Sequence, residues 1–232
     1  MGYDQRFDKR GFDEMREITA QAGVIARADG SGYFKIGHTE AYAAVYGPRN
    51  LYPRFMQDPQ RGILRCKYNM MPFSGAGDRV RPGTSRRSKE LSWVTEQALL
   101  PVLSLEDFPN AVVDVFIELP QTDAGTRAAG ICAASIALAD AGLAMKDLVS
   151  AVAVGRVGDR IVVDLTKEEE DYEGGVADMA VAMSPRLGQI TLLQMDGDLT
   201  KEALDEGLGK ARDALANIRE IQIRALKDRY TR

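Results

Sequence analysis

The sequence predicts an α+β fold in which mixed β-sheets pack against helices. Two observations lead to this prediction. Short apolar runs with strand-like alternation, separated by glycine and proline, recur through the chain, whereas helical spacing is confined to a few segments. Strands and helices also seldom alternate in the regular way that a parallel α/β sheet needs. Because no linker or internal repeat interrupts the pattern, we expect a single domain over residues 1–232.

The first strands are expected in a β-meander over residues 20–46. Asp29-Gly30 and Ser31-Gly32 are typical of a turn, and Gly47-Pro48 is expected to end the meander. Residues 48–61 combine prolines and arginines without periodicity, so they indicate a cationic loop. The expected strands of the meander are Val24–Ala28, Tyr33–Ile36 and Ala41–Tyr46.

The middle of the chain predicts two strands and a helix. A strand at Ile63–Met71 precedes a second basic loop over residues 74–87. This loop leads into a helix that Pro101 closes or kinks. Val112–Leu119 alternates cleanly and predicts the next strand. The apolar positions with helical spacing are Leu91, Val94 and Ala98.

The C-terminal half predicts two helices and three strands. Residues 120–141 favour a turn followed by a helix of small residues that ends at Gly142, and Gly158-Asp159 is a hairpin signal. Thr200 is a suitable N-cap for a long helix over about residues 200–228. The expected strands are Val149–Gly155, Arg160–Leu165 and Ile190–Met195. The apolar stripe of the last helix is Leu204, Leu208, Ala211, Leu215 and Ile218.

The composition excludes several classes of protein. No run approaches the ~20 apolar residues of a membrane span, and the charged N-terminus lacks the apolar core of a signal peptide, so we expect no membrane partner and a cytoplasmic location. His38 is the only histidine, which excludes a histidine-based triad within one chain. Cys66 and Cys132 lie among apolar neighbours, so we expect buried free thiols.

The segment Asp123-Ala-Gly-Thr-Arg127 indicates an anion site. Its glycine suits a close turn at the start of the predicted helix, where unpaired N–H groups and a partial positive charge favour an anion. Arg127 would add a planar, permanently charged fork that fits phosphate. The same residues could equally form an ordinary helix cap.

Charged residues elsewhere could converge on this segment. Arg86 and Arg87 begin a predicted helix, where cations oppose the helix dipole, so either a bound anion or pairing with surface carboxylates is expected. The acidic stretch over residues 168–173 is by default a solvated loop. Asp178 differs because apolar residues flank it, which indicates partial burial and a task. That task is neutralising an arginine, donating a proton or holding a divalent cation.

Several motifs in order resemble the RNase PH family over roughly residues 8–225. They are Asp123-Ala-Gly-Thr-Arg127, the helix at 133–142, Val-Val-Asp-Leu at 162–165, Ala-Asp-Met at 177–179 and Met-Pro-Phe-Ser at 71–74. Within that family, Ser85-Arg-Arg-Ser and the strand at 61–68 look most like catalytic subunits of archaeal exosome rings. The resemblance implies the RNase PH fold, related to the second domain of ribosomal protein S5. It also implies phosphorolysis of RNA from its 3′ end to nucleoside diphosphates, with reverse RNA tailing.

The resemblance also assigns roles to residues. Asp178 matches the catalytic aspartate, as general acid or as a ligand of Mg²⁺, and inorganic phosphate is the co-substrate. Asp171 approximates a second carboxylate, although its spacing from Asp178 is one residue too long. The implied phosphate-binding residues are Arg86, Arg87, Gly125, Thr126, Arg127 and Ala128. The implied RNA-binding residues are Arg49, Arg54, Arg61, Arg65, Lys67 and Tyr68, the last by stacking on a base.

The implied partners are single-stranded RNA, a non-catalytic RNase PH-like paralogue in a hexameric ring, and RNA-binding cap subunits. Two alternatives use the same residues differently. One is a homo-oligomeric RNase PH that trims tRNA 3′ ends, and the other is a non-catalytic ring subunit that only binds RNA. The second expects the arginines or Asp178 to be replaced, but all are present. An unrelated phosphate-binding module would make every motif a coincidence.

Overall fold

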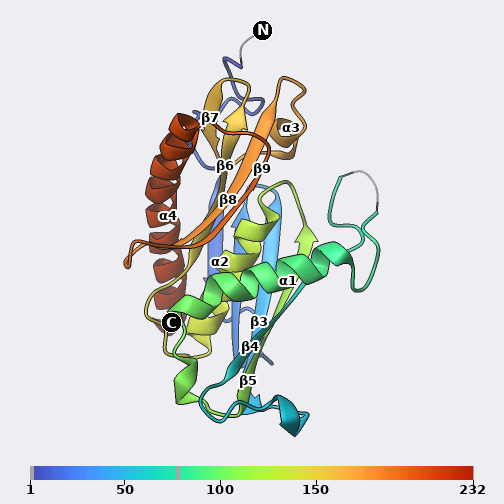
Figure 1. Cartoon of the computed structure of the whole chain (residues 1–232), viewed down its shortest axis with the longest axis vertical. Helices are drawn as coiled ribbons and strands as arrows, with labels where there is room; N and C mark the ends of the chain where they lie inside the picture. The colour runs from blue at the N-terminus through green and yellow to red at the C-terminus, as the bar shows by residue number, and fades with distance from the viewer. Residues whose placement is uncertain (1–2, 77–78, 232) are drawn as a thin grey trace.

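Two β-sheets and four α-helices make up the computed structural model, which describes residues 3–76 and 79–231 (Figure 1). The first sheet has the strand order β1-β2-β3-β5-β4, and its neighbours are antiparallel except for β4 and β5, which run parallel. Its strands are β1 (Ile18–Ala22), β2 (Gly30–Ile36), β3 (Thr39–Asn50), β4 (Ile63–Met70) and β5 (Ala111–Gln121).

The second sheet is antiparallel throughout and has the order β7-β6-β8-β9. Its strands are β6 (Ser150–Val157), β7 (Arg160–Val163), β8 (Val176–Ser184) and β9 (Gln189–Asp196). The hairpin between β6 and β7 turns at Gly158-Asp159, as the sequence predicts. The mixture of sheets and helices confirms the expected α+β class.

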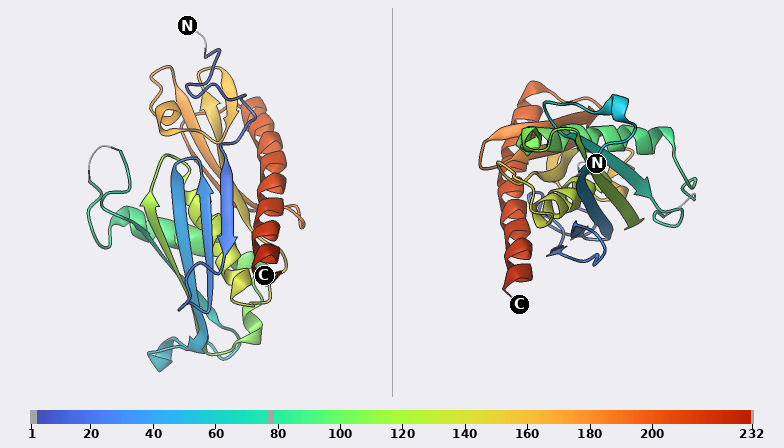
Figure 2. Two further views of the ribbon diagram at one scale, coloured as in Figure 1. Left: turned by 180° about the vertical axis from the view of Figure 1, so that it is seen from behind. Right: turned by 90° about the horizontal axis from the view of Figure 1, so that it is seen from below.

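Helix α2 (Thr126–Asp140) is the most buried helix and packs against β2, β3 and β6. Its small residues allow this close packing, and β2 matches them with glycines. A Cβ at Gly32 would lie 2.4 Å from the carbonyl oxygen of Ala133, so only glycine lets the strand approach the helix this closely. Seen from behind in Figure 2, β1, β2 and β3 lie in front of α2.

The other helices cover the outside of this core. The long helix α4 (Lys201–Tyr230) packs on β1 of the first sheet and on β6 and β7 of the second, so it joins the two sheets (Figure 1). Helix α1 (Arg86–Leu99) lies along β4 and also contacts β9. Short pieces are α3 (Lys167–Glu170) and the 3₁₀ turns Arg54–Met56, Leu100–Val102 and Leu105–Asp107.

Most predicted elements are confirmed. The predicted strands at 63–71, 112–119, 149–155, 160–165 and 190–195 match β4, β5, β6, β7 and β9 within a few residues. Thr200 caps α4 through its side chain, which accepts a hydrogen bond from the Ala203 N–H. Pro101 follows α1 in a 3₁₀ turn. Cys66 and Cys132 are buried free thiols, as expected. Residues 77–78 of the second basic loop lie outside the described residues.

The start of the meander was predicted wrongly. The first strand is Ile18–Ala22, and Val24–Ala28 form a loop and turn after Gly23, whose φ is +74°. Gly30 and Gly32 lie within β2 and do not form a turn. A side chain at either position would collide with the backbone of α2 or of Ala141 just after it. Strand β3 continues through Gly47-Pro48 to Asn50, with a register shift against β5 between Tyr46 and Arg49.

The acidic stretch is also more ordered than predicted. Lys167–Glu170 form one helical turn, which Thr166 and Glu169 cap reciprocally, and the Glu169 side chain is buried. No helix within residues 3–76 and 79–231 has both the length and the apolar character that crossing a bilayer requires.

Candidate active site

A cavity of about 410 Å³ lies where the N-terminus of α2 meets α3, β8 and the end of β9. Helix α2 therefore supplies one wall of the cavity, and the second sheet supplies the opposite wall. Charged side chains of both signs face this space. They are Arg87, Arg127, Lys167, Glu170, Asp178 and Asp196.

The wall from α2 is built by the loop at residues 123–125. Ala124 and Gly125 both have left-handed backbone conformations, with φ of +54° and +61°, so the chain turns sharply before the helix begins. Gly125 is the N-cap and offers no side chain to the first N–H groups of α2. Thr126, Arg127 and Ala128 line the cavity at this point, so the start of α2 presents an anion-binding terminus to it.

Arg127 and Asp178 face the cavity with unpaired polar atoms. The Arg127 Nε and the Asp178 Oδ1 are buried, and neither has a hydrogen-bond partner among the described residues. Buried polar atoms normally have partners, so this pair indicates a place for a polar ligand. Burial raises the pKa of Asp178, and the Asp196 carboxylate adds to this effect, while the Arg127 guanidinium opposes it. Asp196 lies directly opposite Asp178 in the β8–β9 ladder.

Glu170 is a cavity residue that sequence reasoning missed. Burial and the nearby Asp178 carboxylate raise the pKa of Glu170 to about 7, against the lowering influence of Lys167. The signal was present in the sequence. Thr166 and Glu169 have capping-box spacing, which predicts a helical turn that places Lys167 and Glu170 on one face.

Two predicted residues do not line the cavity. Asp171 is exposed, and its Oδ1 pairs at 2.6 Å with the Nζ of Lys167, which does line the cavity. Arg86 and Arg87 are both exposed, but of the two only Arg87 lines the cavity. The structure therefore brings together Arg87, Arg127 and Asp178, with the 125–128 backbone, and leaves Arg86 and Asp171 outside.

The arginines expected to bind RNA lie far from the cavity along the first sheet. Asn50 pairs with Ala111 at the start of β5, and the loop at residues 123–125 follows the other end of this strand. Because β5 has 11 residues, the two ends are about 30 Å apart. Arg54 and Arg61 belong to the loop beyond Asn50, which Figure 1 shows at the lower end of the sheet.

Other residues of this group lie on β3 and β4. Arg65 makes two hydrogen bonds to Asp114, at 2.8 and 2.9 Å, and the Lys67 ammonium lies over the Phe116 ring. Arg49 lies over the Tyr46 ring and is half-exposed. All three stay accessible beside their partners.

Tyr68 corrects an expectation. Its ring is only 3% exposed and packs beneath α2, where a Cβ at Gly130 would lie 2.8 Å from the ring. It therefore offers no face for a base to stack on. The alternation of β4 turns Arg65 and Lys67 outward and Cys66 and Tyr68 inward.

The described residues contain no group of three or more histidine, cysteine, aspartate or glutamate side chains placed to hold a metal ion. Mg²⁺ often binds to only one or two carboxylates together with substrate phosphates, so a Mg²⁺ site does not require such a group of three side chains. The buried, unpaired Oδ1 of Asp178 is the donor that fits such an ion best.

Known proteins resemble this chain over nearly its whole length. The model of the "3' exoribonuclease family, domain 1" matches residues 14–144, and that of domain 2 matches residues 147–214. "Exosome complex component Rrp41" of Methanopyrus kandleri is 48% identical over 225 residues, which cover 97% of this chain and 93% of that protein.

Solved structures share the fold. Rice (Oryza sativa) Rrp46 superposes with a TM-score of 0.81 at 22% identity, covering 95% of this chain and all of that chain. A chain of the Archaeoglobus fulgidus exosome with RNA bound to the active site superposes with a TM-score of 0.79 at 24% identity, covering 94% and 92%. The two matched models together span both walls of the cavity, and the chain belongs to the RNase PH family of 3′ exoribonucleases.

Proposed function

We propose that this chain is a phosphorolytic 3′→5′ exoribonuclease that shortens single-stranded RNA, releases nucleoside diphosphates and can run in reverse to add tails. One observation carries the proposal. The N-terminus of α2 and Arg127 line the same cavity as Asp178. An anion-binding site therefore lies beside a carboxylate whose pKa is raised.

The reaction joins two anions, so charge must be neutralised. Inorganic phosphate binds at the N–H groups that begin α2 and at the guanidinium groups of Arg87 and Arg127. Its oxygen attacks the phosphorus of the last phosphodiester, and the bond from that phosphorus to the 3′ oxygen of the preceding nucleotide breaks. Fixed cations and dipoles stabilise the developing charge, and positioning supplies much of the remaining acceleration.

The departing 3′ oxygen needs a proton. Asp178 donates it, because burial and the Asp196 carboxylate raise the pKa of this carboxyl and so favour its protonated form. Glu170 lines the same cavity, and its pKa of about 7 makes it a second group there that can hold a proton near neutral pH. Where Mg²⁺ binds, Asp178 would hold it, and the ion would supply charge neutralisation at the departing oxygen. No covalent nucleophile is required.

The first experiment follows oligo(A) labelled at the 5′ or the 3′ end, with and without inorganic phosphate. Nucleoside diphosphates that form only with phosphate support phosphorolysis. Nucleoside monophosphates formed without phosphate would contradict the roles given to Arg87 and Arg127. The same assay with nucleoside diphosphates and no phosphate tests the reverse, tailing reaction.

We further propose that the chain works in a hexameric ring with a non-catalytic paralogue and RNA-binding cap subunits. The name of the Methanopyrus kandleri relative supports membership of such a complex. Large apolar side chains also lie exposed on two elements in contact, α1 and β9, which favours a subunit interface there. The exposed residues are Trp93 of α1 and Ile190, Leu193 and Met195 of β9, with Leu187 in the turn before β9.

The chain alone and the chain mixed with its paralogue distinguish the alternatives. A homo-oligomeric RNase PH that trims tRNA ends would assemble and cleave by itself. A non-catalytic RNA-binding subunit would release no nucleotide in either mixture. Dependence on the paralogue supports the hetero-ring. The expected cytoplasmic location stays a prediction.

A further inference from the structure

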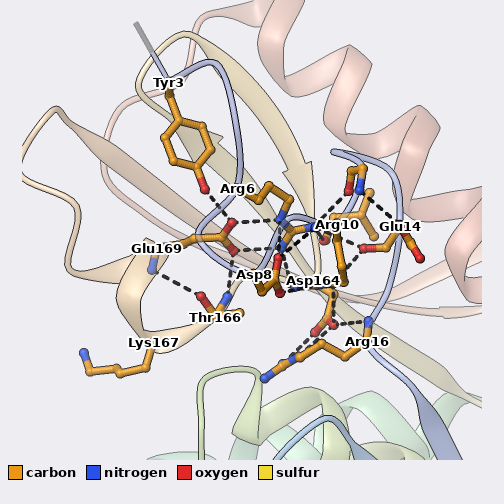
Figure 3. Close-up of polar contacts among 12 residues, drawn as sticks. Tyr3, Arg6, Asp8, Arg10, Glu14, Arg16, Asp164, Thr166, Lys167 and Glu169 are labelled. Atoms are coloured by element: carbon orange, nitrogen blue, oxygen red, sulfur yellow. Dashed lines mark hydrogen bonds and ion pairs between the residues drawn. The ribbon is translucent and has the colours of Figure 1, made fainter. Parts of the chain in front are cut away.

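Two buried arginines precede β1 and lie outside the cavity. Figure 3 shows the segment that carries them, residues 3–16, against the end of β7 and against α3. The Arg6 side chain is fully buried and that of Arg16 is 7% exposed. Burying an arginine is expensive unless its hydrogen bonds are satisfied, so the partners of these two residues define what the segment does.

Arg16 joins the two walls of the cavity. Its Nε and Nη2 donate to the two carboxylate oxygens of Asp164 at 2.8 and 2.7 Å, at the end of β7. Its Nη1 donates to the carbonyl oxygen of Asp123 at 2.6 Å, in the loop that begins α2. One guanidinium therefore holds the second sheet in a fixed position relative to residues 123–125, which we call the phosphate loop.

The surroundings of Arg16 are shaped to admit it. A Cβ at Gly37 would lie 2.4 Å from the Arg16 Cδ, so the turn between β2 and β3 leaves space for this side chain. A Cβ at Gly125 would lie 3.5 Å from its Nη2, which places the guanidinium against the N-cap of α2 itself. Thr39 fixes the same loop from the other side, through hydrogen bonds with the Asp123 backbone.

Arg6 fixes the position of α3 in a similar way. Its Nε and Nη2 donate to the two carboxylate oxygens of Glu169 at 2.8 and 2.7 Å, and the Tyr3 hydroxyl donates to the first of them at 2.6 Å. A helix of four residues has no stability of its own, so its orientation comes from such contacts. Glu169 stands next to Glu170 and two residues after Lys167, which both line the cavity.

We propose that Arg6 and Arg16 are positioning residues of the active site: Arg16 sets the phosphate loop and Arg6 sets α3. The inference rests on the proposed function, because it assigns consequences to phosphate binding and turnover. Residues 3–13 precede the part of the chain that the family models match. A displacement of about 1 Å at a reacting group can lower a rate about a hundredfold, so a contact behind the site matters to the chemistry.

The test compares conservative variants of the full chain. Arg16→Lys keeps a cation beside Asp164 but cannot also reach the Asp123 carbonyl. We expect the KM for phosphate to rise about tenfold with a smaller change in kcat, because the loop binds phosphate in the ground state and in the transition state alike. Arg10→Lys is the matched control, because Arg10 also contacts Asp164 but makes no contact with the loop.

Arg6→Lys gives the complementary result. It loosens α3 but leaves the loop, so we expect kcat to fall about tenfold while the KM for phosphate stays near that of the unchanged chain. Circular dichroism at the assay temperature verifies that each variant is folded. Equal shifts in KM for Arg16→Lys and Arg10→Lys, or unchanged kinetics in both Arg6→Lys and Arg16→Lys, would overturn the inference.

Calorimetric titration with inorganic phosphate separates this inference from the proposed function. The measurement needs no turnover, so it applies even where the unchanged chain proves inactive. Weaker phosphate binding in Arg16→Lys alone supports the positioning role. Equal binding in the unchanged chain, Arg16→Lys and Arg10→Lys rejects it, whatever the activity assay gives.

Discussion

Asp178 owes its chemistry to its partial burial and to two charged neighbours. It lies half-buried on β8, where the Asp196 carboxylate of β9 raises its pKa and the Arg127 guanidinium of α2 lowers it. Sequence reasoning found Asp178 because its apolar flanks indicated burial. It could not find Asp196, since the pairing of β8 with β9 brings these two carboxylates together. It placed Asp171 beside Asp178 by resemblance, whereas the helical turn directs Glu170 to the cavity and pairs Asp171 with Lys167.

We expect Asp178→Asn to bind RNA as the unchanged chain does but to lose about a hundred- to ten-thousandfold in kcat, because the amide donates no proton. Asp171→Asn is the matched control and is expected to change kcat little, since its side chain lies outside the cavity. Filter binding and single-turnover kinetics measure both. Full turnover by Asp178→Asn would remove the acid role, and a large loss in Asp171→Asn would restore the role implied by resemblance.

Arg127 is expected to act on phosphate more than on RNA. Arg127→Ala removes a charged hydrogen-bonding group worth about 1.5–3 kcal/mol, which corresponds to about a ten- to hundredfold rise in the KM for phosphate. Arg127→Lys keeps the charge without the planar fork and is expected to restore only part of this loss. Phosphate titrations at saturating RNA measure the effect. A phosphate dependence like that of the unchanged chain would contradict it.

At the scale of elements, sequence patterns located most strands and the three longer helices, α1, α2 and α4. It did not explain the glycines. In the sequence, Gly30 and Gly32 resemble turn residues, because a turn and a close approach by a helix both favour glycine. The contact with α2 involves residues about a hundred positions later, which no local pattern reports.

Gly32→Ala tests that contact. Its methyl group would collide with the Ala133 carbonyl oxygen, so we expect a loss of about 1–3 kcal/mol in the free energy of unfolding. Gly209→Ala on the exposed face of α4 meets no atom within 4 Å and is expected to stabilise by up to about 1 kcal/mol. Urea unfolding of both variants gives the comparison. Equal effects would mean that β2 and α2 are not in close contact.

The turn α3 should respond to acid. Burial alone would raise the pKa of Glu169, but hydrogen bonds from Arg6 and Tyr3 outweigh it and hold the pKa below the usual 4.5. The folded chain therefore releases this proton more readily than the unfolded chain does. The resulting stability is fully present above about pH 4.5 and is lost as the pH falls through the lowered folded-state value.

Thermal unfolding between pH 7 and pH 3 measures this dependence. The gap in Tm between the unchanged chain and Glu169→Gln is expected to be widest near neutral pH and to narrow below about pH 4.5. Glu173→Gln, on an exposed residue of the following loop, serves as the control. A gap that stays constant down to pH 3 would mean that Glu169 does not titrate in this way.

For the whole molecule, the α+β class followed from the sequence, but the order of strands and the role of residues 3–16 did not. Single-domain organisation stays a prediction. One apolar cluster contains residues of both sheets, such as Val115 of β5 and Val152 of β6, and this favours it. We expect a single unfolding transition in calorimetry, with equal calorimetric and van't Hoff enthalpies. Two separated transitions would show independent halves that correspond to the two family models.

The buried arginines near the N-terminus also set an order of events during synthesis. Arg16 pairs with Asp164, which lies 148 residues later in the chain, and Arg6 pairs with Glu169, which lies 163 residues later. While only the first sheet has been synthesised, both guanidinium groups stay hydrated. The phosphate loop then lacks the connection that Arg16 makes from it to Asp164. The active site therefore forms only after the second sheet has been synthesised. A product that terminates before the second sheet contains the N-terminus of α2 but lacks Asp178.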